Sequence, residues 1–500
     1  MTFDFSKFSR QSSKGIIIIF IGNAYKSLKS LWVLLPMVII GKSNPSKVKL
    51  IIISLSLFIL FLFIKSFLDF FYFKFKIENN HFILKEGVLH KKSLSIPFDR
   101  IQNVNFKQSF VQQFINVTQV EIETAGTQKT EISIKALSRL KAEAIKSIIF
   151  SNKSIVIEQE QSVEKNIKKA LLKISFSDLL KVSVTENHLK SFGVFVAFLI
   201  VVYSQLREVF KDFTINETLG FNLENEASYS LYGFIFILIF SVVIGLIISF
   251  VRVFLLHFNL TLFVKKGDLE ISQGLLTKRS ITLKKEKVQH ISIITNPFKQ
   301  LFGMSSVDFK QANSKITKKN LAIRIVGCQK EHLDSIKKIL FSACEVEAEI
   351  AIKPHKYFIA RMFLRSFFWL ALVNSLIFFT IYFGFKTSGN YFVFLLNIVV
   401  IALMVFLIML KYKKSYYKIS TNILLKGSGQ VSTQKTYFEF FKIQSIKRKQ
   451  TFFQKQKNVV NLELHTANKR IELPCVPLEE ATNLINYFLY KTEISEKPWI

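Results

Sequence analysis

The sequence carries one four-residue stretch in three related copies: Ile101-Gln102-Asn103-Val104, Val288-Gln289-His290-Ile291 and Ile443-Gln444-Ser445-Ile446. A glycine stands 14 residues before the first residue of each copy, at Gly87, Gly274 and Gly429. An alternation of apolar and polar residues follows each copy at a common spacing, at Val120-Glu121-Ile122, Val307-Asp308-Phe309 and Leu462-Glu463-Leu464. Matching at one offset through three copies is the mark of repeated structural units. The chain is therefore predicted to fold as three copies of one module.

Within a copy the residue pattern has the period of two that β-strands require. In the first copy, residues 73–77 and 81–85 are strand-like on either side of a turn at Asn79-Asn80, and residues 94–96 lead into the tetrad. Each copy ends in apolar residues at helical spacing, over residues 136–150, 329–341 and 478–490. The sequence thus predicts a module of roughly 75 to 80 residues, in which antiparallel strands are closed by one amphipathic helix.

The tetrad is predicted to be structural. Two apolar residues that flank a Gln at strand spacing would place Ile101 and Val104 against the core, around a bulge or turn. Gln102 would then satisfy backbone groups. Contact of this Gln with a ligand is the weaker alternative.

The composition is that of a membrane protein. Of the 500 residues, 50% are hydrophobic, and the mean hydropathy is +0.31, which is too apolar for a soluble chain. Apolar runs near the roughly 20 residues that a bilayer core requires occur at residues 51–71, 231–256, 367–385 and 391–410. Residues 192–206 and 31–40, the latter preceded by residues 15–30, are weaker runs that would bring the total to six spans.

The spans fall in pairs, with one pair ahead of each repeat, so all three repeats are expected on one face of the membrane. Lys65, Asp69 and Arg252 lie towards span ends rather than at mid-membrane, so no ion pathway is predicted. No small-residue cleavage site follows the first apolar segment, and no cleaved signal peptide is expected.

The expected orientation follows from the distribution of charge. The net charge is +33, and the abundance of Lys together with Ile, Phe and Asn fits an AT-rich genome, so no nucleic-acid partner is predicted. The loop 207–230 holds five acidic against two basic residues, whereas the N-terminal segment and the repeats are rich in Lys. By the positive-inside rule the repeats face the cytoplasm from a multi-pass protein of the cytoplasmic membrane. Cys328, Cys344 and Cys475 lack metal-like spacing and are expected to be reduced thiols.

The predicted organisation alternates membrane pairs with β-rich domains. The expected segments are an N-terminal segment with the first pair (1–72), domain 1 (73–150), a linker (151–190), the second pair (191–257), domain 2 (258–342), a linker (343–366), the third pair (367–410), domain 3 (411–492) and a tail (493–500). Differences in spacing between the tetrads are assigned to variable connectors.

The module has a family resemblance. The order of strands, the turn glycine, the tetrad, the run Glu121-Ile122-Glu123-Thr124-Ala125-Gly126 and the closing helix resemble the bacterial pleckstrin-homology-like (PH-like) domain of membrane proteins. Three copies with paired spans resemble the YdbT-like family, and residues 174–180 ahead of the third span share in the resemblance. The resemblance implies a fold of two packed antiparallel sheets with a C-terminal helix in each domain, between α-helical transmembrane pairs.

The three copies are unequal. The first has Pro97 and a Thr-Ala-Gly turn, where the second has Lys284 and the third has Glu439 in place of the proline. The third copy also has a shortened strand region, which makes a ligand site there doubtful.

Basic residues gather around each tetrad and are the candidate contacts to anionic lipid: Lys91, Lys92, Arg100, Lys107, Lys278, Arg279, Lys284, Lys285, Lys287, Lys442, Lys447, Arg448 and Lys449. A Lys or Arg near an anionic leaflet contributes about 1 kcal/mol of binding. The alternative is a solvated surface in a Lys-rich protein, and the sequence leaves both open. The second repeat has the densest cluster, so we expect it to contact headgroups most strongly.

No catalytic constellation is visible in the sequence. The eight His residues are scattered, no two have the spacing of a helical metal site, and Gly427-Ser428-Gly429 is too short for a phosphate-binding loop. We therefore expect a non-enzymatic protein without a catalytic residue, a metal or a cofactor. It would present three cytoplasmic domains as a protein- or lipid-binding scaffold, and the alternative is a transporter or exporter with regulatory domains.

The expected partners are membrane lipids and, in a homo-oligomer, further copies of the chain. The resemblance further implies a shorter membrane protein with a single PH-like domain as a partner, and roles in envelope stress or antimicrobial resistance.

Overall fold

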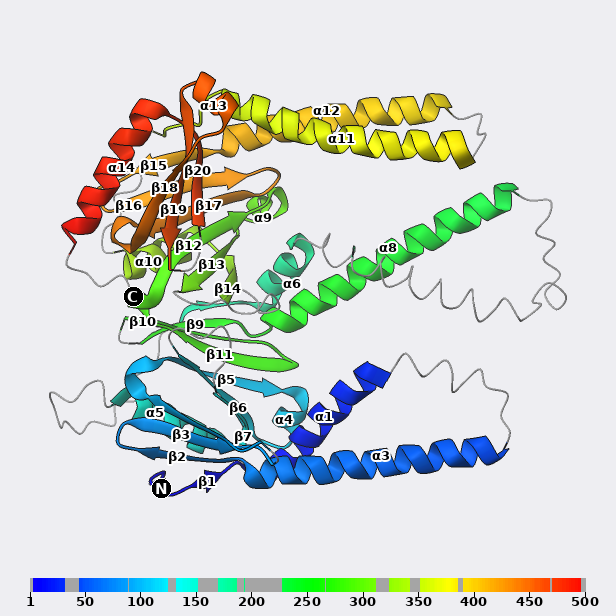
Figure 1. Cartoon of the computed structure of the whole chain (residues 1–500), viewed down its shortest axis with the longest axis vertical. Helices are drawn as coiled ribbons and strands as arrows, with labels where there is room; N and C mark the ends of the chain where they lie inside the picture. Colours follow the sequence, from blue (N-terminus) through cyan, green and yellow to red (C-terminus); the bar gives the residue numbers. More distant parts are fainter. Residues whose placement is uncertain are drawn as a thin grey trace. The chain divides into compact units, whose positions relative to one another are not determined.

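The computed structural model describes residues 3–31, 45–88, 90–124, 132–151, 170–186, 193, 227–265, 267–311, 323–341, 351–384, 390–467 and 470–495 (Figure 1). The chain forms two compact units. Unit 1 comprises Met1–Lys169, Lys173–Leu262 and Glu270–Thr282, and unit 2 comprises Ala170–Leu172, Phe263–Leu269 and Leu283–Ile500. The boundary runs through the second repeat, whose strands before the tetrad fall mainly in unit 1 and whose tetrad falls in unit 2. The compact units therefore do not coincide with the sequence repeats.

The first repeat, in unit 1, has the predicted pair of antiparallel sheets. One contains β2 (Lys74–Glu78), β3 (His81–Glu86) and β4 (Lys92–Pro97). After the turn η2 (Phe98–Arg100), the other contains β5 (Ile101–Ser109), β6 (Thr118–Thr124) and β7 (Ile132–Leu137), and the helix α5 (Arg139–Ser151) follows. Phe75 and Phe82 from the first sheet pack in one core with Ile122 and Ile134 from the second and Ile145 from α5. The strands alternate buried and half-buried residues, as in β6, which explains the period of two in the sequence.

The tetrads lie at a β-bulge. Ile101 and Val104 are buried, and the pairing of β5 with β6 shifts register between Ile101 and Asn103. The same shift recurs between Val288 and His290 and between Ile443 and Ser445. The predicted core position around a bulge is confirmed. The side chain of Gln102 lies outside the described part, and its bonds to backbone groups stay a prediction.

The third repeat, in unit 2, has the same order of elements. Its strands are β15 (Tyr416–Ile419), β16 (Ile423–Gly429), β17 (Thr433–Glu439), β18 (Ile443–Lys449), β19 (Val459–Thr466) and β20 (Arg470–Pro477), followed by α14 (Leu478–Glu493). The prediction that its strand region is shortened is wrong. β19 and β20 each have 8 residues, against 7 and 6 in β6 and β7. The shortening therefore falls in the connection between the two strands, where it removes no pair of hydrogen-bonded strand residues.

The sheets continue from one repeat into the next. The second repeat contributes β9 (Thr261–Lys265), β10 (Asp268–Gln273), β11 (Thr277–Leu283), β12 (Val288–Thr295), β13 (Ser305–Gln311), β14 (Ile323–Cys328) and α10 (Lys330–Leu340). In unit 1, β11 pairs antiparallel with β5 of the first repeat, which we call joint 1 (Figure 1). In unit 2, β12 pairs antiparallel with β17 of the third repeat, which we call joint 2. The repeats are therefore hydrogen-bonded to their sequence neighbours.

Two helices precede each repeat in the described part of the chain. They are α1 (Gly15–Leu31) and α3 (Pro45–Tyr72), then α6 (Phe176–Thr185) and α8 (Ala227–His257), then α11 (Tyr357–Gly384) and α12 (Asn390–Lys414). Among the described residues, Ile53–Tyr72 and Ile239–His257 are long and apolar enough to cross a bilayer. The predicted spans 31–40 and 192–206 lie outside the described residues except at Leu31 and Gly193.

The segments on both sides of each helical pair meet in a sheet. β1 (Ser9–Arg10), which precedes α1, pairs with β2, which follows α3. Ile352 forms a β-bridge with Tyr417, and α11 and α12 lie between these two residues in the sequence. Ile174, which precedes α6, donates its backbone N–H to the backbone oxygen of Leu260, which follows α8, at 3.0 Å. Residues 174 and 352 lie in the predicted linkers, so parts of those linkers belong to the folded repeats. Each helical segment thus leaves a sheet and returns to it.

Candidate membrane-interface site

A short helix follows the tetrad strand in every repeat. The helices are α4 (Phe110–Phe114), α9 (Pro297–Leu301) and α13 (Phe452–Gln456), and their third residues are the buried Gln112, Lys299 and Gln454. Gln112 donates from Nε2 to the oxygen of Lys135 at 2.7 Å, Lys299 from Nζ to Ser306 Oγ at 2.7 Å, and Gln454 from Nε2 to Asn461 Oδ1 at 3.0 Å. A polar anchor therefore fixes the inner face of each helix to its own sheet.

The outer faces of these helices are apolar and exposed. The exposed side chains are Phe110 and Phe114 in α4, Phe298 and Leu301 with the adjacent Phe302 in α9, and Phe452 and Phe453 in α13. Phe114 keeps 86% of its accessible surface, Leu301 79% and Phe452 71%. Single exposed apolar residues are ordinary, but aromatic clusters at one repeat position in three copies mark a surface for an apolar partner.

In unit 1, α4 lies beside the end of α8. Gln113 donates from Nε2 to the backbone oxygens of Leu275 and Leu276, at 2.9 and 3.2 Å. Leu275 in turn donates its backbone N–H to the oxygen of Leu255 in α8, at 2.9 Å. Leu275 and Leu276 are themselves exposed. The apolar face of α4, this turn and the last turns of α8 therefore form one surface.

The turn at Leu275 depends on a glycine. Gly274 has a φ of +106°, and a Cβ there would collide with the carbonyl oxygen of Thr277. Gly87 and Gly429 have φ values of +99° and +129° and would collide in the same way with the residue three positions on. The glycine shared by the three copies is thus required by the backbone of this turn.

Unit 2 repeats the arrangement. Thr295, two residues before α9, lies opposite Thr433 in joint 2, so α9 begins next to the β16–β17 turn. At that turn the exposed Val431 accepts a hydrogen bond of 2.7 Å through its backbone oxygen from Lys414 Nζ at the end of α12. A long apolar helix, a β-turn and a short helix with exposed apolar side chains thus meet in both units.

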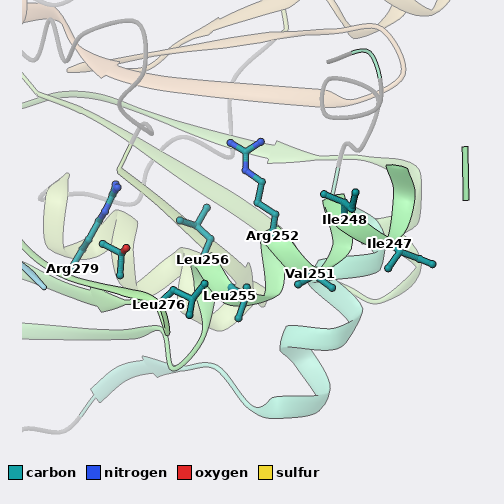
Figure 2. Close-up of a pocket in the computed structure, with 9 residues that line it drawn as sticks. Ile247, Ile248, Val251, Arg252, Leu255, Leu256, Leu276 and Arg279 are labelled. Atoms are coloured by element: carbon teal, nitrogen blue, oxygen red, sulfur yellow. The ribbon is translucent and has the colours of Figure 1, made fainter. Parts of the chain in front are cut away.

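A cavity of about 500 Å³ opens at this surface in unit 1. Its walls are aliphatic side chains of α8, with Leu276 and Thr277 from the turn, and the guanidinium-bearing residues Arg252 and Arg279. In the view of Figure 2 both guanidinium groups extend to one side of the row of aliphatic side chains. The volume is within the range of roughly 300–1,000 Å³ that small-molecule sites occupy.

Arg279, which is one of the residues that line the cavity, has a buried donor without a partner in the described part of the chain. Its Nε is buried and has no hydrogen-bond partner among the described residues. A buried donor without a partner costs about 1–3 kcal/mol, and an anionic group would satisfy it with a charge-assisted bond. Apolar walls with two guanidinium groups suit an amphiphile that joins an acyl chain to an anionic head.

The structure separates the predicted lipid contacts into three environments. Lys91, Lys92, Arg100, Lys278, Lys447, Arg448 and Lys449 are exposed, whereas Lys107, Arg279, Lys284, Lys285 and Lys287 are half-buried. Lys442 is buried: its Nζ donates to the oxygen of Val288 at 2.6 Å and pairs with Glu439 at 2.8 Å, so its ammonium is engaged by protein groups. Lys92 pairs with Glu86 at 3.7 Å and Lys449 with Glu463 at 3.0 Å. The hydrogen bond from Lys449 lowers the pKa of the Glu463 carboxyl.

Sequence reasoning missed the apolar half of this site. The sequence placed Arg252 only towards a span end, and it did not single out the exposed aromatic residues of the short helices. Phe110 and Phe452 occupy one repeat position, nine residues after the first residue of the tetrad, and that spacing could have pointed to them. In the described part of the chain, no group of three or more His, Cys, Asp or Glu side chains is placed to hold a metal ion.

Comparisons with known proteins agree with this architecture. The chain is 29% identical over 253 residues to the UPF0699 transmembrane protein YdbT of Bacillus subtilis (strain 168), a match that covers 48% of this chain and 50% of that protein. The match thus spans half the length of the relative. No solved structure matches the chain. The family model described as the bacterial PH domain matches residues 19–153, 193–343 and 366–492. These matches cover more than half of the chain, each includes one tetrad, and the protein therefore belongs to the bacterial PH domain family.

Proposed function

We propose that this protein is a non-enzymatic integral membrane scaffold whose three PH-like domains face the cytoplasm and bind lipid at the membrane surface. The observation that carries the proposal is the cavity between α8 and the Gly274 turn, because two arginines line it together with aliphatic side chains at the end of a span-length helix. The ligand chemistry that fits is an anionic phospholipid.

The strand pairing around the helices supports the paired-span topology. β1 and β2 are hydrogen-bonded to one another although α1 and α3 separate them in the sequence. A chain that starts and ends at one sheet crosses the membrane an even number of times. The same reasoning applies to α11 and α12, which lie between Ile352 and Tyr417. An even number of crossings keeps the repeats on one face, and their Lys content favours the cytoplasmic face.

The exposed apolar helices support contact with the bilayer. Full burial of a Phe or Leu side chain contributes about 1.5–3 kcal/mol, so the two Phe residues of α4 would stabilise interfacial binding substantially. Basic residues nearby, such as the exposed Lys278, add attraction to an anionic leaflet. The combination of aromatic and basic groups is typical of surfaces that lie in the headgroup region.

The test uses the full chain, because joints 1 and 2 tie the second repeat to both neighbours and an isolated residue 258–341 segment would lose those pairings. Native mass spectrometry in mild detergent would compare retention of phosphatidylglycerol and phosphatidylcholine. We expect the unchanged chain to prefer phosphatidylglycerol, and a double variant Arg252→Gln with Arg279→Gln to lose about tenfold in that retention. Lys173→Gln, which removes an exposed charge elsewhere in unit 1, is the matched control.

Two outcomes would overturn the lipid proposal. One is equal retention of the two phospholipids by the unchanged chain, and the other is a double variant that behaves as the Lys173→Gln control does. Thermal unfolding of each variant would separate loss of binding from loss of folding.

The physiological role would lie in envelope stress or antimicrobial resistance. A deletion strain should become more sensitive to membrane-active peptides, and the chain with Arg252→Gln and Arg279→Gln should fail to restore resistance. Full restoration by that variant would separate the role from lipid binding.

A further inference from the structure

Joints 1 and 2 use the same register. In joint 1, Lys278 lies opposite Gln108, and in joint 2, Thr433 lies opposite Thr295. Lys278 and Thr433 each stand ten residues before the first residue of their own tetrad, and Gln108 and Thr295 each stand seven residues after the first residue of theirs. In both joints, one strand of a repeat thus pairs in the same register with a defined strand of the next repeat.

At each end of the series of three repeats, one strand edge of the kind that forms a joint has no partner strand among the described residues. β4, the counterpart of β11 and β17, is the last strand of its sheet, and β18, the counterpart of β5 and β12, is the last strand of its own. No strand in the described part of the chain pairs with either of these two edges.

Burial shows the difference between a used and an unused edge. His290 and Ser292 in β12 are buried in joint 2, whereas Ser445 and Lys447, at the same positions of β18, are exposed. In β4, Lys92 and Ser93 are exposed in the same manner. An unpaired edge with free backbone donors and acceptors is a template for another strand.

The positive charges on the two edges do not prevent pairing. In joint 1, Arg279 lies directly opposite Lys107, and the strands still pair. The corresponding residues of the unused edges are Lys92 and Lys449, each of which has an acidic partner in its own sheet, Glu86 and Glu463. These acidic partners reduce the repulsion between Lys92 and Lys449 when the two edges approach each other.

We propose that β18 of one copy of this protein pairs with β4 of a second copy in the register of joints 1 and 2. A second copy is the occupant because this chain carries both complementary edges. The contact is head-to-tail, so it forms a closed ring or an open row, according to the rotation between copies. It would bring the Gly87 turn of one copy beside α13 of the next, as Gln113 brings the Gly274 turn beside α4. The inference rests on the proposed scaffold function, whose protein partner it names.

Disulfide cross-linking tests the register. By the shared pairing, Ser93 lies opposite Arg448, as Ser280 lies opposite Phe106 and Lys435 opposite Ile293. Both Ser93 and Arg448 are exposed, so neither change disturbs a core. Chains with Ser93→Cys and chains with Arg448→Cys, each with Cys344→Ser, would be co-expressed and oxidised in membranes. We expect a covalent dimer from this mixture and none from either chain alone.

Ser95→Cys with Arg448→Cys is the off-register control. Diagonal neighbours lie about 7–8 Å apart, beyond the usual Cα separation for a disulfide of about 4.4–6.8 Å, so little dimer should form. Absence of the expected dimer, or equal yield from the control pair, would overturn the inference. Co-purification of a smaller PH-like protein in place of a second copy would overturn it as well. Phosphatidylglycerol retention is measured separately, so the lipid proposal is tested independently of the pairing between β18 and β4.

Discussion

Lys442 donates a hydrogen bond of 2.6 Å from its Nζ to the backbone oxygen of Val288, and pairs with Glu439 at 2.8 Å. Val288 opens the tetrad of the second repeat, and Lys442 immediately precedes the tetrad of the third. The side chain is 6% exposed, so the contact is shielded from water. A residue that resembles its basic neighbours in sequence therefore holds two repeats together.

Replacement of Lys442 by Met should destabilise unit 2. Removing one member of a buried ion pair leaves the other charge uncompensated and costs about 3–5 kcal/mol, and the oxygen of Val288 also loses its partner. Denaturant unfolding in detergent should show this loss. Lys447→Met, at an exposed position, should change the free energy of unfolding by less than about 0.5 kcal/mol. Similar stability of the two variants would contradict the role assigned to Lys442.

Gly274→Ala should destabilise unit 1 by about 2 kcal/mol. The residue has a φ of +106°, and the added Cβ would meet the oxygen of Thr277. Gly303→Asn is the matched control, because Gly303 has a φ of +63° with open space around it, and asparagines occupy the equivalent positions 116 and 458 at φ values of 55° and 50°. Thermal unfolding should separate the two variants, and equal melting temperatures would contradict the turn argument.

Glu123→Gln should stabilise the protein at neutral pH. Burial raises the pKa of the Glu123 carboxyl above 4.5, although Asn103 Nδ2 donates a hydrogen bond of 3.3 Å to it. The folded state thus binds the proton more tightly than the unfolded state, so ionised Glu123 weakens folding above its folded-state pKa. The advantage of the variant should be largest at pH 7–8 and shrink as the pH falls through the folded-state pKa towards 4.5. Glu121→Gln is the control, and an advantage independent of pH would contradict this account.

Phe114→Trp should place an indole in the bilayer interface. In a background whose three native Trp residues are replaced by Phe, brominated lipids should quench the fluorescence of the introduced indole. Leu140→Trp, on the exposed face of α5, should stay unquenched. Equal quenching of the two variants would contradict the assignment of α4 to the membrane surface.

Accessibility tags placed after Asp212 and after Glu160 should report opposite sides of the membrane. Both positions lie outside the described residues, and the expectation follows from paired spans with cytoplasmic repeats. Accessibility labelling in intact and permeabilised cells measures this directly. The same side for both tags would overturn the paired-span topology.

Two of the three cysteines lie in the described part of the chain. Cys328 and Cys475 are buried and unpaired with one another, and burial raises the pKa of Cys328 to about 12. The spacing of these cysteines in the sequence already argued against a metal motif. Their burial could be learned only from the packing of the sheets.

Local features were predictable because they depend on near neighbours in the sequence. The alternation in β6 gives its buried face, the glycine before each tetrad gives the turn, and the apolar spacing at 478–490 gives α14. The bulge followed from two apolar residues around a Gln, since the core must accept both Ile101 and Val104.

The candidate site was predictable only in part. Basic residues near the tetrad were visible, but Lys442 and Lys447 could not be told apart, because burial of Lys442 depends on a strand 154 residues away. The cavity joins Arg252 with Arg279, which the turn at Gly274 brings beside α8.

The sequence by itself determined three β-rich modules, their register, their closing helices and the apolar runs between them, because each rests on periodicity or on a single backbone requirement. Only the tertiary structure decided that sheets run on from one repeat into the next, and that the edges of β4 and β18 have no partner in the described chain. Strand edges carry backbone donors and acceptors that any sequence provides, so the choice of neighbour is set by the packed fold and leaves no pattern along the chain.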